Sequence, residues 1–175
     1  MKKTILILIT LFISASVQAS DLVTVPFVDP SRYVGVWYQM ANNPAFFDRD
    51  CVCSRQALSI RKDGLLDVYN TCNNMTSSGP LREIRGKAKN LDSSTNAKFK
   101  VDFGLPTKGD YWIIALDADY RYAVVSEPSK KSLFILSRTP DMDAVLYEQA
   151  VAEAALQVDV SKLELTKHAG CTYPN

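Results

Sequence analysis

Histidine is almost absent from this chain, and its scarcity narrows the chemistry that the chain can perform. The single histidine among the 175 residues is His168, close to the C-terminal end. A Ser/His/Asp triad could be built only around this residue, and no nucleophile-elbow motif accompanies it. One histidine near the end of a chain is also a weak indication of haem ligation. We therefore expect no hydrolytic site and no cofactor.

Closely spaced metal ligands are missing as well. Four cysteines are present, but Cys51 and Cys53 are separated by one residue, which is closer than in most zinc sites, and no second close pair follows. The sequence therefore predicts no metal site. In an exported chain, these cysteines are better explained as disulfides.

An excess of charge of one sign is lacking too. The chain has 20 basic and 19 acidic residues, and 18 of the basic ones remain once Lys2 and Lys3 are set aside with the leader described next. Proteins bind nucleic acid and anionic membranes through concentrated positive charge. We therefore expect no nucleic-acid partner. The sequence leaves open a transient contact with a membrane surface, and it leaves open either a monomer or a homodimer.

Long apolar runs occur only at the start of the chain. A Lys2-Lys3 head, an apolar run over residues 5–13 and the small-residue ending Val17-Gln18-Ala19 have the pattern of a secretory signal peptide. We assign residues 1–19 to this peptide and residues 20–175 to one domain with its own core. No cysteine follows the predicted cleavage site, so we expect a soluble periplasmic or secreted protein without a lipid anchor.

The remaining sequence is divided into short alternating or β-branched segments separated by turn residues, which indicates an antiparallel sheet with hairpin connections. The expected strands cover residues 36–41, 54–60, 65–71, 83–88, 99–103, 111–116, 122–126 and 133–137. Apolar residues then recur at helical spacing from Met142 to about Gln157, after the capping sequence Thr139-Pro140-Asp141. Because closure removes two exposed sheet edges, we predict an all-β fold, an eight-stranded antiparallel up-and-down barrel with one C-terminal α-helix packed outside.

Three motifs resemble the signature regions of the lipocalins. They are Gly35-x-Trp37 after a turn at residues 29–32, the Leu-Asp-x-x-Tyr-Arg-Tyr sequence of residues 116–122, and Leu-Ser-Arg-Thr-Pro at residues 136–140. Their order and spacing also match. The similarity runs from about residue 29 to residue 171 and is greatest to bacterial lipocalins and to apolipoprotein D. This resemblance implies a barrel that holds one small ligand.

The resemblance also implies structural roles for Trp37 and Arg138. In the family, the arginine that matches Arg138 lies across the tryptophan that matches Trp37 at the closed barrel end, as a cation–π contact. Gly35 allows the backbone to approach a neighbour where a Cβ would clash. The alternative, in which Arg138 binds an anionic ligand head group, is disfavoured because a ligand should enter at the opposite, open end.

Strand alternation and the resemblance together predict the side chains that line the lumen. The resemblance to apolipoprotein D implies Leu58, Asn70, Tyr111 and Phe134, and alternation adds Phe99, Val101, Phe103, Ile113 and Leu136. This lining suits one long acyl chain with its polar head near the mouth. The alternative is that these side chains simply fill a small barrel as its core. Phe46 and Phe47, in the first long loop, either form an apolar lid or pack locally.

The four cysteines allow three pairings. The resemblance to apolipoprotein D implies a disulfide between Cys53 and Cys171, which leaves Cys51 for Cys72. The second hairpin strand brings Cys72 back past residues 51–53, but a two-residue slip preserves the side-chain face, so register alone cannot choose between Cys51 and Cys53. The pairing of Cys53 with Cys72 and of Cys51 with Cys171 therefore stays open.

From these features we expect a non-catalytic carrier of a small lipophilic ligand, a fatty acid or a lysophospholipid, in lipid transport or storage in the cell envelope. The alternative is an enzyme on the same barrel, since a few lipocalins resemble this chain and yet transform lipophilic substrates, in one case through a lumenal thiol. A free Cys51 or Cys53 would favour the enzyme, whereas four paired cysteines would leave no thiol nucleophile.

Overall fold

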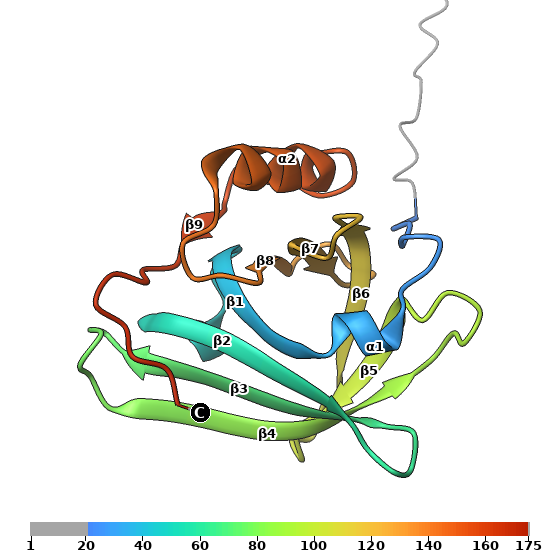
Figure 1. The fold of residues 1–175 in the computed structure, drawn as a ribbon, viewed down its shortest axis with the longest axis horizontal. Helices are drawn as coiled ribbons and strands as arrows, with labels where there is room; N and C mark the ends of the chain where they lie inside the picture. Colours follow the sequence, from blue (N-terminus) through green and yellow to red (C-terminus); the bar gives the residue numbers. More distant parts are fainter. Residues whose placement is uncertain (1–20, 175) are drawn as a thin grey trace, which may run out of the picture.

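One antiparallel sheet closes on itself to form a barrel (Figure 1). The structure, a computed structural model, describes residues 21–174. Within this part of the chain each strand pairs with the next in sequence, and β1 pairs with both β2 and β8, which closes eight strands into a barrel. The predicted up-and-down barrel is confirmed. The assigned signal peptide lies outside the described residues.

The barrel strands are longer than expected at several ends. They are β1 (Gly35–Asn42), β2 (Cys51–Ile60), β3 (Leu66–Asn74), β4 (Leu81–Asn90), β5 (Lys98–Asp102), β6 (Gly109–Leu116), β7 (Tyr122–Ser126) and β8 (Leu133–Ser137). The difference is largest for β4, where the alternating pattern predicted residues 83–88. Backbone pairing with β3 continues to Leu81, opposite Asn73, although the side chains there are exposed. Hydrogen bonding of the ladder, rather than apolar burial, therefore sets the ends of this strand.

The chain enters the barrel through a short capped helix, α1 (Pro30–Tyr33). The Asp29 side chain accepts a hydrogen bond from the Ser31 backbone N–H, and Pro30 occupies the first turn, where a backbone donor is not needed. This helical turn precedes β1 and covers the end of the barrel at which β1 begins. It confirms the turn or single helical turn that residues 29–32 predict.

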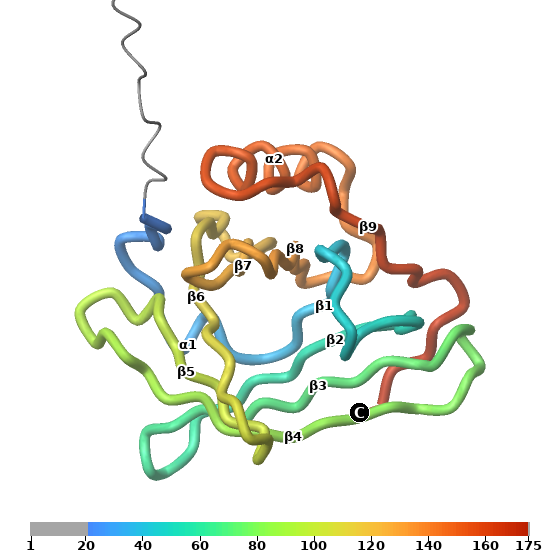
Figure 2. The backbone as a smooth tube through the Cα atoms, turned by 180° about the vertical axis from the view of Figure 1, so that it is seen from behind, coloured from blue at the N-terminus to red at the C-terminus, as the bar shows by residue number. Residues whose placement is uncertain are grey.

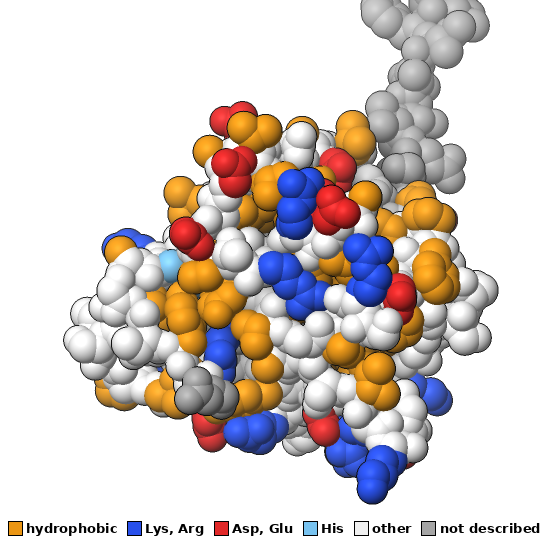
Figure 3. Space-filling model, viewed as in Figure 1, with side chains coloured by type: hydrophobic (Ala, Val, Ile, Leu, Met, Phe, Trp, Pro, Cys, Tyr) orange, Lys and Arg blue, Asp and Glu red, His pale blue; other side chains and the backbone are white. Residues whose placement is uncertain are grey.

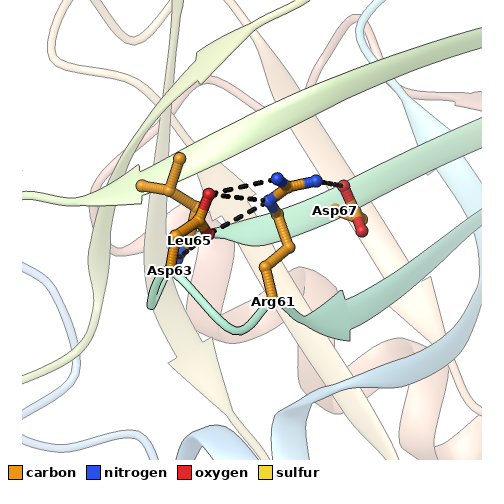
Figure 4. Close-up of polar contacts among 4 residues, drawn as sticks. All are labelled: Arg61, Asp63, Leu65 and Asp67. Carbon is orange, nitrogen blue, oxygen red and sulfur yellow. Dashed lines mark hydrogen bonds and ion pairs between the residues drawn. The ribbon is translucent and has the colours of Figure 1, made fainter.

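The β2–β3 turn at the same end is held by an ionic cluster (Figure 4). Arg61 contacts Asp63 at 3.1 Å and Asp67 at 2.9 Å, and the Leu65 backbone N–H donates to Asp63 at 3.2 Å. The Arg61 guanidinium lowers the pKa of Asp63 through its hydrogen bonds. Since the cluster is exposed to water, it fixes the shape of the turn and adds little to stability.

One helix, α2 (Ala144–Ala155), packs against the outside of the barrel, as predicted (Figures 1 and 2). It lies over β6, β7 and β8 and buries Ala150 and Ala154 against their outer face. Its start differs from the prediction, because the Asp143 side chain accepts from the backbone N–H groups of Val145 and Leu146 and acts as the cap. No helix in residues 21–174 has the length and apolar character needed to cross a bilayer.

A two-residue strand, β9 (Glu164–Leu165), follows α2 and pairs with β1 outside the closed barrel. On the face shown in Figure 3, acidic and basic side chains are interspersed, which agrees with the balanced charge of the sequence. The surface on this face offers no concentrated positive region of the kind that binds nucleic acid.

Two disulfides lie toward the open end of the barrel, away from Trp37. Cys51 is bonded to Cys72, and Cys53 is bonded to Cys171 in the C-terminal tail. This is the pairing that the resemblance implied. The described residues contain no free cysteine.

A β-bulge in β2 distinguishes the two neighbouring cysteines. The β2–β3 register shifts within residues 52–55, and Cys53 has a positive φ of 56°. Cys51 lies opposite Asn74 and shares a face with its disulfide partner two residues earlier in β3. Cys53 lies within the bulge, and its N–H donates to the carbonyl of Lys167 in the tail at 2.9 Å. The expectation that both cysteines occupy equivalent positions on one face is therefore wrong.

Candidate functional site

Trp37 forms the floor of the barrel lumen. Its side chain is completely buried, and the indole N–H donates to the carbonyl of Tyr33 at 2.8 Å. The guanidinium carbon of Arg138 lies 3.6 Å from the centre of the Trp37 ring. Gly35 has a φ of +100°, and a Cβ there would lie 3.4 Å from the Arg138 guanidinium. The three residues occupy the closed end, where the resemblance placed Trp37 and Arg138.

We call the half of the lumen next to Trp37 the lower half and the half next to the open end the upper half. The lower half is filled by packed apolar side chains. Five predicted residues are buried in a single cluster with Trp37: Leu58, Phe99, Val101, Ile113 and Leu136. The cavity that remains among them measures about 10 Å³, which is close to the space of one water molecule. These side chains therefore act as the core of the lower barrel, which is the alternative that the sequence left open for them.

A polar cluster lies within this apolar region. The hydroxyls of Tyr33 and Tyr111 are 2.7 Å apart, and the Tyr111 hydroxyl donates to Oε1 of Gln56 at 3.1 Å. Since Tyr111 uses its proton in that bond, Tyr33 must donate to Tyr111. Burial raises the pKa of both tyrosines, so both stay neutral over the physiological range. The small cavity adjoins all three side chains.

The upper half of the lumen is more open. Asn70 and Phe134 face inward on their strands and are only partly buried, and Ile84, the cross-strand partner of Asn70, is 37% exposed. The Oδ1 atom of Asn70 is buried and accepts no hydrogen bond from the described residues. Lumen-facing side chains are thus covered near the floor and accessible near the mouth. This gradient identifies the upper lumen as the accessible part of the site.

Phe103 lies in the barrel wall rather than fully inside. It follows the last residue of β5, packs against the lumen cluster and also lines a groove on the outer surface. Its ring lies so close to Gly86 of β4 that a Cβ at that glycine would come within 2.6 Å of it. Its packing against the lumen cluster agrees with the predicted inward position, although β5 ends one residue earlier.

Alternation also identifies lumen residues that the predicted set omitted. Gln56, Leu66, Val68 and Ala88 line the small cavity, and Ile84 lies above them. Their signal was present in the sequence, since each lies two or four residues from another inward residue on the same strand. Four of these five residues are apolar, and Gln56 is the polar one.

A larger hollow lies outside the barrel and differs in character. It measures about 670 Å³ and crosses the outer face of β3, β4 and β5. Its lining includes Arg85, Lys87, Lys89, Lys100 and Lys108. A surface dominated by ammonium and guanidinium groups does not suit a lipophilic molecule. The lumen is therefore the better candidate site despite its smaller cavity.

His168 lies in the C-terminal tail and contacts β1. Its Nε2 is 2.8 Å from the carbonyl oxygen of Gln39, and its Nδ1 is 2.5 Å from the Tyr173 hydroxyl. Both ring nitrogens are therefore used in holding the tail. The described residues contain no group of three or more His, Cys, Asp or Glu side chains that could hold a metal ion.

Comparison with known proteins agrees with this barrel. Residues 28–168 match the family described as "Lipocalin-like domain". The chain is 36% identical over 143 residues to the outer membrane lipoprotein Blc of Escherichia coli K12, which covers 81% of this chain and 80% of Blc. It is 34% identical over 159 residues to temperature-induced lipocalin-1 of Arabidopsis thaliana, which covers 85% of this chain and 84% of that protein.

A solved structure supports the fold independently. Insecticyanin from the tobacco hornworm Manduca sexta superposes with a TM-score of 0.70 at 20% identity, over 89% of this chain and 90% of insecticyanin. At this level of identity the likeness concerns the fold alone.

Proposed function

The chain belongs to the lipocalin family, and we propose that its barrel binds one long-chain fatty acid or lysophospholipid and carries it through an aqueous compartment. Membership in the family supports the binding of a small hydrophobic ligand in general. The choice of an acyl chain rests on the shape and lining of the lumen.

The observation that carries this proposal is the gradient of exposure along the lumen. Ile84 and Phe134 offer accessible apolar surface near the mouth, whereas the lower lumen is filled down to Trp37. An amphiphile placed in such a lumen buries its chain against these side chains and leaves its polar head in water. A compact polar solute would gain nothing from the same surface.

Asn70 supplies a polar contact within the upper lumen. Its buried Oδ1 atom is without a hydrogen-bond donor among the described residues, and such an atom is costly unless a partner is supplied. The glycerol hydroxyl of a lysophospholipid is a suitable donor. A fatty-acid carboxylate has no proton to donate, so this atom favours the lysophospholipid of the two ligands.

We propose that the protein acts as a carrier without catalysis. The thiol route to an enzyme requires a free cysteine at the lumen, and Cys51 and Cys53 are both in disulfides. The polar cluster at the floor consists of neutral tyrosine hydroxyls and one amide, and it lacks a base near neutral pH. These features support binding rather than chemistry.

We further propose that the carrier works in the periplasm or after secretion. Two disulfides are typical of proteins that fold in an oxidising compartment.

Native mass spectrometry of the protein purified from its own host tests this proposal directly. We expect a complex with one bound amphiphile whose released mass is that of a fatty acid or a lysophospholipid. Asn70→Leu should weaken the binding of lysophosphatidylcholine by about tenfold and that of oleic acid by much less, since about 1.4 kcal/mol corresponds to tenfold. If neither the native protein nor a purified apoprotein titrated with these lipids binds any acyl chain, the proposal is wrong.

A further inference from the structure

The loop between β1 and β2 exposes two phenylalanine rings to water. Phe46 is 86% exposed and Phe47 is 65% exposed, and both lie in η1 (Phe46–Asp48), a single 3₁₀ turn. The guanidinium carbon of Arg49 lies 6.0 Å from the centre of the Phe46 ring, and most of the surface of both rings faces water. Large apolar side chains that are left in water at one place usually mark a contact surface.

The loop is nevertheless rigidly held. Asp48 accepts hydrogen bonds from the Asn42 side chain at 2.6 Å and from the Ala45 N–H at 3.0 Å. The guanidinium of Arg82, on β4, donates to the carbonyls of Phe47 at 2.9 Å and Arg49 at 3.0 Å. These contacts fix the backbone while the rings remain outside. The exposure of the phenylalanines is therefore built into the loop.

A third apolar side chain comes from the next loop at the same end of the barrel. Met75 is 68% exposed, and its N–H donates to the carbonyl of Asp50 at 2.6 Å, which joins the β3–β4 loop to the β1–β2 loop. We call Phe46, Phe47 and Met75 the mouth patch. Because both loops follow strands that run away from Trp37, the patch lies beside the open end of the lumen.

The charges around the mouth patch are balanced. Asp48, Arg49 and Asp50 lie in the β1–β2 loop, and Arg82 of β4 contacts this loop, so two basic side chains accompany two acidic ones. The patch therefore has no net charge to attract a polyanion over a distance. Any binding at the mouth patch must therefore be driven by burial of its apolar side chains.

We propose that the mouth patch inserts into the surface of a phospholipid bilayer and places the open end of the barrel against it. Rings that face mainly water offer no shaped surface to a folded partner, whereas the fluid acyl region of a bilayer accepts them without a preformed pocket. The bilayer is also where a lipophilic ligand resides. This inference rests on the proposed function, since docking allows the ligand to pass between lumen and bilayer without crossing water.

Vesicle binding by paired variants tests the inference. The full chain and a Phe46→Ser/Phe47→Ser double variant are mixed with phosphatidylcholine vesicles and separated by sedimentation. We expect the double variant to bind at least about tenfold more weakly, because burial of even one phenylalanine changes a partition constant by about this factor. Leu156→Ser is the matched control, since Leu156 is 83% exposed at the end of α2 and should leave vesicle binding unchanged.

A reporter at the patch gives a second measurement. In the Phe46→Trp variant, the added tryptophan should shift its emission to shorter wavelength on vesicles and be quenched by bromine atoms placed on the lipid chains. Binding should persist at 0.5 M salt, because the patch carries no net charge. Loss of binding at that salt concentration would indicate the basic outer groove instead and would contradict the inference.

The design separates docking from ligand binding. In vesicle-free buffer the double variant should bind lysophosphatidylcholine as the parent does, and only the rate of lipid transfer from vesicles should fall. Failure of the parent to bind vesicles, or equal binding by the double variant, would refute docking and leave the carrier function standing. Concentration-dependent dimerisation that the double variant abolishes, without parent binding to vesicles, would assign the patch to a second copy and would also refute it.

Discussion

The guanidinium of Arg138 lies over the indole of Trp37 and also joins the backbone of two segments that are distant in sequence. Besides the 3.6 Å contact with the ring, it donates to the carbonyls of Tyr33, Val34 and Val36 at 3.0 to 3.1 Å. Arg138 therefore fastens the end of β8 to α1 and the start of β1. Arg138 therefore acts as a clamp at the closed end of the barrel, whereas the proposed ligand binds near the open end.

This clamp predicts that lysine cannot replace the arginine. Arg138→Lys should lower the free energy of unfolding by about 1 to 3 kcal/mol, because a single ammonium cannot cover the ring and reach several carbonyls together. Urea unfolding followed by circular dichroism measures the change. Arg61→Lys is the control, since the Asp63 and Asp67 side chains that pair with Arg61 are about half exposed and its replacement should cost less than about 1 kcal/mol. Equal effects of the two variants would remove the clamp role.

The two disulfides should differ in what they contribute to stability. The Cys53–Cys171 bond spans 118 residues, and the Cys51–Cys72 bond spans 21. In the chain-entropy account, loss of the longer loop costs about 4 to 5 kcal/mol and loss of the shorter one about 3 kcal/mol. Cys53→Ser/Cys171→Ser should therefore unfold at lower urea concentration than Cys51→Ser/Cys72→Ser. The reverse order would contradict this account.

The tail should also loosen in mild acid. Burial lowers the pKa of His168 below its ordinary value of 6.5, so the folded protein binds this proton more weakly than the unfolded chain does. The contribution of His168 is complete above about pH 6.5 and is lost as the pH falls through 6.5 toward the folded pKa. Urea midpoints at pH 8 and pH 5.5 should differ for the parent and differ much less for His168→Gln. Identical pH dependence in both would show that the tail contact is not responsible.

Much of the lumen could be predicted because strand alternation is strict and local. On β6 and β8, a period of two extends the inward positions Tyr111 and Phe134, which the resemblance implied, to Ile113 and Leu136. The ends of strands are harder to predict: β5 ends at Asp102, so Phe103 lies just beyond it, beside Gly86. The sequence also could not predict how fully the lower lumen is packed, because the packing depends on the volumes of side chains from strands that are distant in sequence.

The bulge at Cys53 illustrates a different limit. No sequence pattern predicts a positive φ at a residue other than glycine. The bulge places Cys53 and Cys51 in different positions, although regular alternation would put both side chains on the same face of β2. The resemblance supplied the pairing that register could not. Similarly, the apolar character of Phe46 and Phe47 could not predict that both rings are exposed to water, because the contacts that hold their loop come from Asn42 and Arg82.

The central claim, that the upper lumen holds the lipid, is tested most directly by filling that space from a single strand. Ile84 faces the lumen, and its neighbour Glu83 faces outward. Calorimetric titration with oleic acid and with lysophosphatidylcholine should give a dissociation constant of about 1 μM or lower for the parent and for Glu83→Trp. Ile84→Trp should fold with the same circular dichroism and bind at least about tenfold more weakly. Undiminished binding by Ile84→Trp would contradict a lumenal site.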